Sequence, residues 1–281
     1  MITLAKFLAI SGIILPMLPH KNLIPDINLT PYSIWLATVV VSGISYLSYL
    51  LKRYVFHESG VLVSGIIGGL YSSTATISVL ARKSRKASEQ EANEYVAAML
   101  LAVSMMFLRF MILILIFSRE IFTSIYPYLL IMSVVAAVVA WFIHSRHRRS
   151  KDMADESEDE DSSNPLEFKV ALIFATLFVV FTVLTHYTLV YAGTGGLNLL
   201  SFVSGFSDIT PFILNLLQNT GSVAVLVVVA CSMQAIISNI LVNMFYALFF
   251  AGKGSKLRPW ILGGFGTVIG VNLVLLLFFY L

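Results

Sequence analysis

Long runs of uncharged residues follow one another along almost the whole chain, and they restrict its fold more than any other feature. Each run comes near the roughly 20 residues that a helix needs to cross a bilayer. Because lipid offers the backbone no hydrogen bonds, such runs cross as helices and not as an open sheet. The nine runs are 2–18, 32–51, 59–81, 95–117, 121–143, 168–190, 197–217, 223–250 and 259–281. The sequence therefore predicts an all-α, polytopic membrane protein.

The composition agrees with this class. Hydrophobic residues make up 58% of the chain, charged residues only 12%, and the mean hydropathy is +0.88. A soluble domain carries about 25% charged residues, and the alternating pattern of an outer-membrane barrel is absent. We expect a lipid bilayer as the first partner, no nucleic-acid partner and no cofactor.

Two of the runs contain short segments that match each other without a gap, 136 positions apart. Residues 69–80 read GLYSSTATISVL, and residues 205–216 read GFSDITPFILNL. Both follow the spacing Gly-x-x-[Ser/Asp]-x-Thr-x-x-Ile-x-x-Leu. Paired hydrophobic segments that are interrupted by Gly or Pro in two halves of a chain indicate a transporter-type site near the middle of the membrane. The alternative is that these small residues serve only close helix packing.

A charged stretch, residues 144–167, divides the chain. It contains a block of basic residues and then a block of acidic ones, which predicts a disordered cytoplasmic linker; a cation-gathering or regulatory loop is the alternative. Four runs lie on each side in one order: a plain helix, a Gly/Ser/Thr-rich segment, a long helix and a plain helix. The predicted parts are an N-terminal helix (1–20), a first repeat (32–143), the linker and a second repeat (168–281).

The distribution of Lys and Arg indicates how the two halves are oriented. If all nine runs cross the membrane, ten basic residues lie on one side and seven on the other, which fits the positive-inside rule poorly. If 59–81 and 197–217 each enter and leave on one face, fifteen lie on one side and only Lys21 and Arg119 on the other. We therefore predict inverted repeats with broken or re-entrant segments, in the inner membrane, with a cytoplasmic N-terminus.

Only one acid and one base lie deep inside a hydrophobic run. Asp208 aligns with Ser72 in the repeat, and Arg109 lies in the long helix of the first half. A charge at the centre of an isolated membrane helix costs roughly 2.5–3.5 kcal/mol, so such residues usually have a function. The two could form an ion pair that clamps the halves together, or they could bind a solute or couple its movement to protons.

We predict a substrate site where the two repeats meet. Hydroxyl and carboxylate oxygens there could bind a cation, whereas Arg109 and the N-termini of half-helices could equally hold an anion. A single carboxylate beside an arginine makes a weak site for a divalent cation, so the charge of the substrate stays open. The predicted site residues are Ser72, Ser73, Thr74, Thr76, Asp208, Thr210, Arg109, Asn239 and Asn243.

Several short stretches, in order along nearly the whole chain, resemble a known family. They are residues 14–19 (ILPMLP), 41–45 (VSGIS), 68–76 (GGLYSSTAT), 81–85 (ARKSR), 107–109 (FLR), 164–168 (NPLEF) and 204–208 (SGFSD). They resemble the uncharacterised membrane domain that follows MgtC/SapB-type domains in bacteria and archaea. The resemblance implies an inner-membrane protein without a settled activity. The SSTAT motif is also similar to the Ser-Asn-Thr hairpins of sodium-coupled carboxylate transporters, with serine in place of asparagine.

These observations predict a transporter or channel-like carrier for a small ion or solute. The alternative is a non-transporting membrane regulator or assembly partner, with an MgtC-type domain or a second copy of the chain as its protein partner. We expect no enzymatic activity, because the sequence contains no recognisable nucleophile–base pair or metal-ligand spacing. A polar, water-accessible path between 72–76 and 208–210 is expected of a carrier and not of a regulator.

Overall fold

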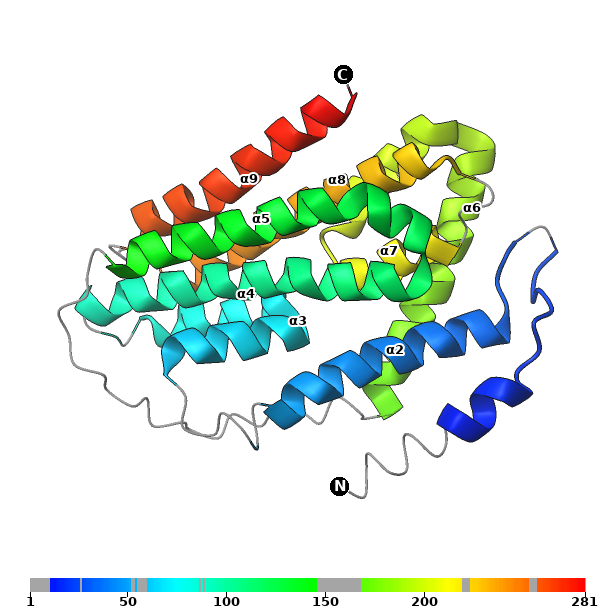
Figure 1. The fold of residues 1–281 in the computed structure, drawn as a ribbon, viewed down its shortest axis with the longest axis horizontal. Coiled ribbons are helices and arrows are strands. Elements are labelled where there is room, and N and C mark those ends of the chain that lie inside the picture. The colour runs from blue at the N-terminus through cyan, green and yellow to red at the C-terminus, as the bar shows by residue number, and fades with distance from the viewer. Residues whose placement is uncertain are drawn as a thin grey trace.

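The protein is helical in the computed structural model, which describes residues 11–25, 27–51, 54, 60–85, 87, 89–145, 168–218, 223–252 and 257–280. A short helix at 11–17 precedes eight labelled helices (Figure 1). They are α2 (Pro31–Leu50), α3 (Val61–Lys83), α4 (Glu89–Phe117), α5 (Arg119–Ser145), α6 (Phe168–Ser204), α7 (Ile209–Gln218), α8 (Val225–Ala251) and α9 (Arg258–Tyr280). No strand forms within these ranges, apart from one isolated bridge between Ile24 and Ile27, and the predicted all-α class is confirmed.

Seven of the helices are long and apolar enough to cross a membrane: α2, α3, α4, α5, α6, α8 and α9. The chain is therefore a multi-pass membrane protein. The predicted runs 168–190 and 197–217 are separated by a kink at Gly193 within α6 (Phe168–Ser204), and the short α7 (Ile209–Gln218) completes the second run. Residues 2–10 of the predicted first helix and residues 146–167 of the predicted linker lie outside the described part of the chain.

Local sequence signals explain where α2 begins. Thr30 accepts a hydrogen bond from the Ser33 backbone, and the Ser33 hydroxyl accepts one from the Thr30 backbone, while Pro31 occupies the first turn. This reciprocal pair satisfies backbone N–H groups that a helix start leaves without partners, and proline suits the first turn because its missing N–H is not needed there.

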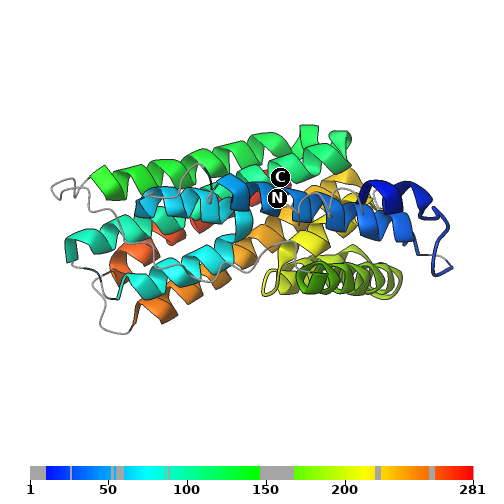
Figure 2. The same cartoon turned by 90° about the horizontal axis from the view of Figure 1, so that it is seen from below.

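The helix α3 doubles back at its centre. Ser72 leaves the helical conformation with φ −159° and ψ 105°. A Cβ on Gly68 would lie 2.8 Å from Cγ2 of Thr76, although an unbroken helix separates residues eight positions apart by about 12 Å. Figure 2 shows the two legs of α3 running alongside each other. The break that the Gly/Ser/Thr-rich sequence predicts therefore lies at Ser72.

A second break lies in the other half of the chain. The helix α6 turns sharply at Gly193, where φ is +60°, a left-handed conformation that glycine adopts without steric cost. The second part of α6 then ends at Ser204, residues 205–208 are not helical, and α7 begins at Ile209. In Figure 1 the end of α6 and the whole of α7 lie inside the bundle, close to α4 and α8.

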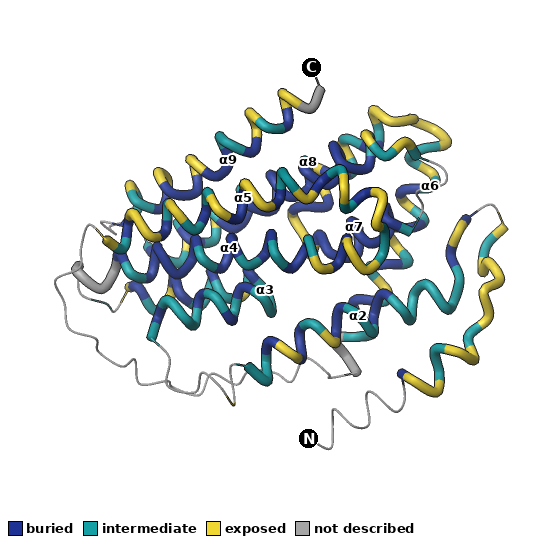
Figure 3. The backbone as a smooth tube through the Cα atoms, in the orientation of Figure 1, coloured by how far each residue is buried: buried dark blue, intermediate teal, exposed yellow. Residues whose placement is uncertain are grey.

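The two long central helices occupy equivalent places in the two halves. Glu89 begins α4 and Val225 begins α8, 136 positions later. These two helices are the most buried of the spans, while α5, α6 and α9 expose large hydrophobic side chains (Figure 3). In a membrane protein such exposed apolar surface faces lipid.

Contacts between the broken segments and the central helices also recur at this interval. A Cβ on Gly69 would lie 2.5 Å from the Cα of Ala102. A Cβ on Gly205 would lie 2.5 Å from the Oγ of Ser238, and both partners of this second contact are 136 positions beyond those of the first. Likewise Gly65 packs on Ala98, and the equivalent residues Ser201 and Gln234 form a hydrogen bond of 2.9 Å. These contacts thus recur at the same interval as the sequence motif.

We expect Gly69→Ala to lower the melting temperature of the detergent-solubilised protein. The added methyl group would press on the backbone of Ala102, and overpacking of this kind typically costs about 1–3 kcal/mol. Gly266→Ala in α9 is the matched control, because no other group lies within 4 Å of its Cβ position. Equal melting temperatures for the two variants would show that α3 and α4 are not in close contact.

Candidate functional site

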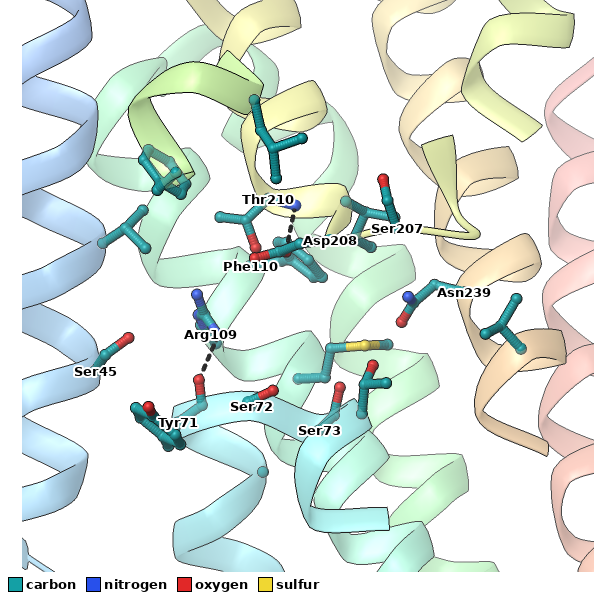
Figure 4. A pocket seen from close by; sticks show the side chains of 18 of the residues that line it. Ser45, Tyr71, Ser72, Ser73, Arg109, Phe110, Ser207, Asp208, Thr210 and Asn239 are labelled. Carbon is teal, nitrogen blue, oxygen red and sulfur yellow. Dashed lines mark hydrogen bonds between the residues drawn. The ribbon is translucent and has the colours of Figure 1, made fainter. Parts of the chain in front are cut away.

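A cavity of about 430 Å³ lies where the two breaks face each other (Figure 4). The break in α3 forms one wall, and residues 206–210, which lead into the first turn of α7, form the opposite one. The helices α2, α4, α6 and α8 complete the lining. The lining residues are Val41, Ser42, Ser45, Gly69, Tyr71, Ser72, Ser73, Thr74, Met106, Arg109, Phe110, Ile173, Phe174, Leu177, Phe206, Ser207, Asp208, Ile209, Thr210, Asn239, Val242 and Tyr246.

Equivalent residues at the two breaks cap the helical legs that follow them. The hydroxyl oxygen of Ser72 accepts a hydrogen bond of 3.4 Å from the backbone N–H of Ala75. The carboxylate of Asp208 accepts one of 2.9 Å from the backbone N–H of Thr210. Serine and aspartate are preferred N-cap residues because they satisfy N–H groups without partners in the helix, and the negative charge of Asp208 also suits the positive end of α7.

Arg109 lies on α4 and reaches the end of the first leg of α3. Its side chain is only 8% exposed, and its Nη1 donates a hydrogen bond of 2.8 Å to the backbone carbonyl of Tyr71. The last carbonyl groups of a helix lack partners within it, and a cation there interacts favourably with the helix dipole. The Nε of Arg109 is buried and has no hydrogen-bond partner among the residues that the structure describes.

Asn239 on α8 makes a comparable contact in the other half, although Phe245 is the residue 136 positions beyond Arg109. Its Nδ2 donates a hydrogen bond of 3.2 Å to the carbonyl of Gly205, at the end of the second part of α6. Asn243, one turn further along α8, donates from its Nδ2 to the Oδ1 of Asn239 at 3.2 Å. On both sides of the cavity, then, a polar side chain of a central helix donates a hydrogen bond to a backbone carbonyl at the end of the helical segment that precedes the break.

Arg109 and Asp208 are not in direct contact in the part of the chain that the structure describes. The charge of Asp208 acts on Arg109 across the cavity, but within the described ranges neither side chain comes within 4.0 Å of an opposite charge. Each is held by the backbone instead, Arg109 by Tyr71 and Asp208 by Thr210. Figure 4 shows the guanidinium group between the tip of α3 and Asp208. Direct contact was one of two alternatives that the sequence left open, because a sequence can show that both charges lie in hydrophobic runs but not how far apart they lie.

A family described as a domain of unknown function (DUF4010) matches residues 39–251. The chain belongs to this family. An uncharacterised protein of Aquifex aeolicus (strain VF5) is 27% identical over 221 residues, which cover 78% of this chain and 94% of that protein. No solved structure matches the chain. The match confirms the resemblance seen in the sequence, and it includes every residue that lines the cavity.

The cavity of this DUF4010 protein brings together most of the predicted site residues. Two of the predicted residues, Thr76 and Asn243, do not line it. Thr76 packs against Gly68 between the two legs of α3, and the Asn243 side chain is hydrogen-bonded to that of Asn239. Those that line it are Ser72, Ser73, Thr74, Arg109, Asp208, Thr210 and Asn239.

Sequence reasoning missed the contribution of α2. Ser42 and Ser45 line the cavity, and their spacing of three places both on one face of the helix. That spacing is the signal that could have identified them. The capping role of Asp208 also had a signal, because an aspartate followed by Pro211 within one turn is typical of a helix start.

The side chains around the cavity restrict its chemistry. Its polar lining consists of hydroxyl groups, amides, one carboxylate and one guanidinium group. Among the residues that the structure describes, no three His, Cys, Asp or Glu side chains lie close enough together to hold a metal ion. The described side chains therefore suit the binding of a polar or charged solute.

Proposed function

We propose that this protein is a transporter or channel-like carrier, without enzymatic activity, that binds a small solute between its two halves. One observation carries the proposal: two broken segments from different halves contribute the polar groups at their tips to one cavity. A non-transporting regulator has no need of such a cavity. In membranes, irregular backbone is tolerated only where protein covers it or where it lines an aqueous cavity.

We further propose that the halves are inverted repeats and that the two broken segments are re-entrant. The ends of α3 and α5 and the start of α9 lie at one end of the bundle in Figure 1, whereas the starts of α5 and α8 lie at the other. Arg82 and Lys83 at the end of α3 and Arg258 at the start of α9 share the first end, while Arg119 is at the second. This distribution supports the assignment of the first end to the cytoplasm by the positive-inside rule.

In this proposal the broken segments control access to the solute. Repeats of opposite orientation can rock against each other around a site at their interface, so that the site opens first to one side and then to the other. The small-residue contacts of Gly69 and Gly205 with the central helices would let each tip move with its own half.

Uptake into liposomes that contain the purified protein tests the proposal directly. A panel of inorganic cations, inorganic anions, carboxylates and amino acids would be presented to protein-containing and to empty liposomes. Accumulation of at least one solute above the empty-liposome level supports transport. Absence of accumulation for the whole panel, with protein of intact fold, would favour the regulator.

Cysteine labelling tests the topology separately. In a Cys231→Ala background, we expect Gly60→Cys and Arg85→Cys to react with a membrane-impermeant maleimide from one side. Thr194→Cys and Ala224→Cys should react only from the other side, because each pair brackets one segment that doubles back. Labelling of Gly60→Cys and Arg85→Cys from opposite sides would mean that α3 crosses the membrane.

A further inference from the structure

Two opposite charges face the same cavity without direct contact between them. Arg109 is almost fully buried, donates one hydrogen bond to a carbonyl, and has no carboxylate within 4.0 Å in the described part of the protein. Asp208 accepts one backbone N–H, which leaves most of its acceptor capacity unused. A buried charge without a counter-charge in contact is costly, so Arg109 favours a bound solute that brings a negative group to it, while the exposed carboxylate of Asp208 has room to accept a positive group.

Several classes of solute fit this arrangement poorly. A divalent cation would have one carboxylate and would be repelled by Arg109, whereas such ions usually collect several carboxylate oxygens. An inorganic dianion would face the carboxylate of Asp208. A neutral sugar would leave both charges without partners. A solute that carries one charge of each sign avoids all three penalties.

The rest of the lining indicates a solute with an apolar part. Phe110, Leu177 and Val242 contribute apolar surface to the cavity, and Ser42 and Ser45 contribute hydroxyl groups from α2. The cavity of about 430 Å³ lies within the range of roughly 300–1,000 Å³ that is typical of pockets for organic ligands. A bare ion would instead need a tight shell of oxygen ligands.

We infer that the cavity binds a small zwitterion of the amino-acid class with an apolar side chain. The carboxylate pairs with the guanidinium group of Arg109, the ammonium group pairs with the carboxylate of Asp208, and the side chain packs against the apolar lining. Arginine suits the first contact because its planar fork matches a carboxylate. This inference rests on the proposed function, since it names the substrate class of the same cavity.

Direct binding to the purified full-length protein in detergent tests the inference independently of transport. Leucine would be compared by calorimetry with two analogues of the same carbon skeleton: 4-methylpentanoate, which lacks the ammonium group, and 3-methylbutylamine, which lacks the carboxylate. Glycine, alanine and valine would extend the series to smaller side chains. We expect the best zwitterion to bind about 100-fold more tightly than either analogue, because each analogue leaves one cavity charge without a partner.

The two charges can then be assigned with variants. Asp208→Asn should reduce the preference for leucine over 4-methylpentanoate, and Arg109→Gln should reduce the preference for leucine over 3-methylbutylamine. Arg119→Gln, at the exposed start of α5, should change neither preference. The comparison of analogues on the unaltered protein needs no variant, so a variant that fails to fold leaves the test intact.

Each outcome separates this inference from the proposed function. An analogue that binds as tightly as the zwitterion overturns the inference, as does the absence of binding by any zwitterion of the series. Liposome uptake of inorganic ions alone would leave the transport proposal standing and overturn the substrate class. Tight zwitterion binding without uptake would support the substrate class and contradict transport.

Discussion

Replacement of Arg109 by glutamine should reduce solute uptake by about 30-fold or more while the protein still inserts into the membrane. The variant retains an amide that can donate a hydrogen bond, but it removes the only buried cation of the cavity lining. The loss of one partner from a buried charge pair typically costs about 2–5 kcal/mol, and each 1.4 kcal/mol corresponds to a factor of about ten. Initial uptake rates in liposomes with matched protein content measure the effect.

Two further variants show whether charge or geometry matters at this position. Arg109→Lys keeps the positive charge but loses the planar fork, so we expect an uptake rate between those of the unaltered protein and Arg109→Gln. Arg119→Gln removes an exposed charge at the start of α5 and should have no effect. An unaltered rate for Arg109→Gln would mean that Arg109 serves only to hold the carbonyl of Tyr71.

The helices and their breaks could be predicted because their signals are local. An apolar run of about 20 residues has one stable form in lipid, and the glycines and hydroxyl residues around Ser72 weaken a helix where they occur. The proximity of the two tips was expected from the predicted repeat, because equivalent residues of repeats are expected to meet at the interface between them. Ser72 and Asp208 line the same cavity although 136 positions separate them.

The remaining features depend on packing that no local signal records. The sequence predicted a boundary between 168–190 and 197–217, where the structure has a kink at Gly193, but not that helix would continue directly on both sides of the kink. Direct contact between Arg109 and Asp208 also depends on packing. Hydrophobic context shows that a charge lies within a membrane segment, but the group that it contacts depends on distances of a few ångströms, and here each side chain contacts a backbone group.

Asp208→Asn should abolish most of the solute binding but leave the stability of the protein nearly unchanged. Asparagine caps a helix about as well as aspartate, so the hydrogen bond to the N–H of Thr210 can persist without the charge. Asp208→Ala removes both the charge and the cap, and loss of a cap typically costs about 1 kcal/mol. Melting temperatures and binding isotherms for the two variants therefore separate the structural role of this carboxylate from its role in the cavity.

The equivalent residue in the other half supplies the matched control. Ser72→Ala removes the cap at the break of α3 without any change of charge, so its melting temperature should fall by about as much as that of Asp208→Ala. Because Arg109 and Asp208 do not pair directly, the double variant Arg109→Gln/Asp208→Asn should recover neither stability nor binding. Recovery of stability in the double variant would show that the two charges hold the halves together. Binding by Asp208→Asn as tight as that of the unaltered protein would restrict Asp208 to the capping of α7.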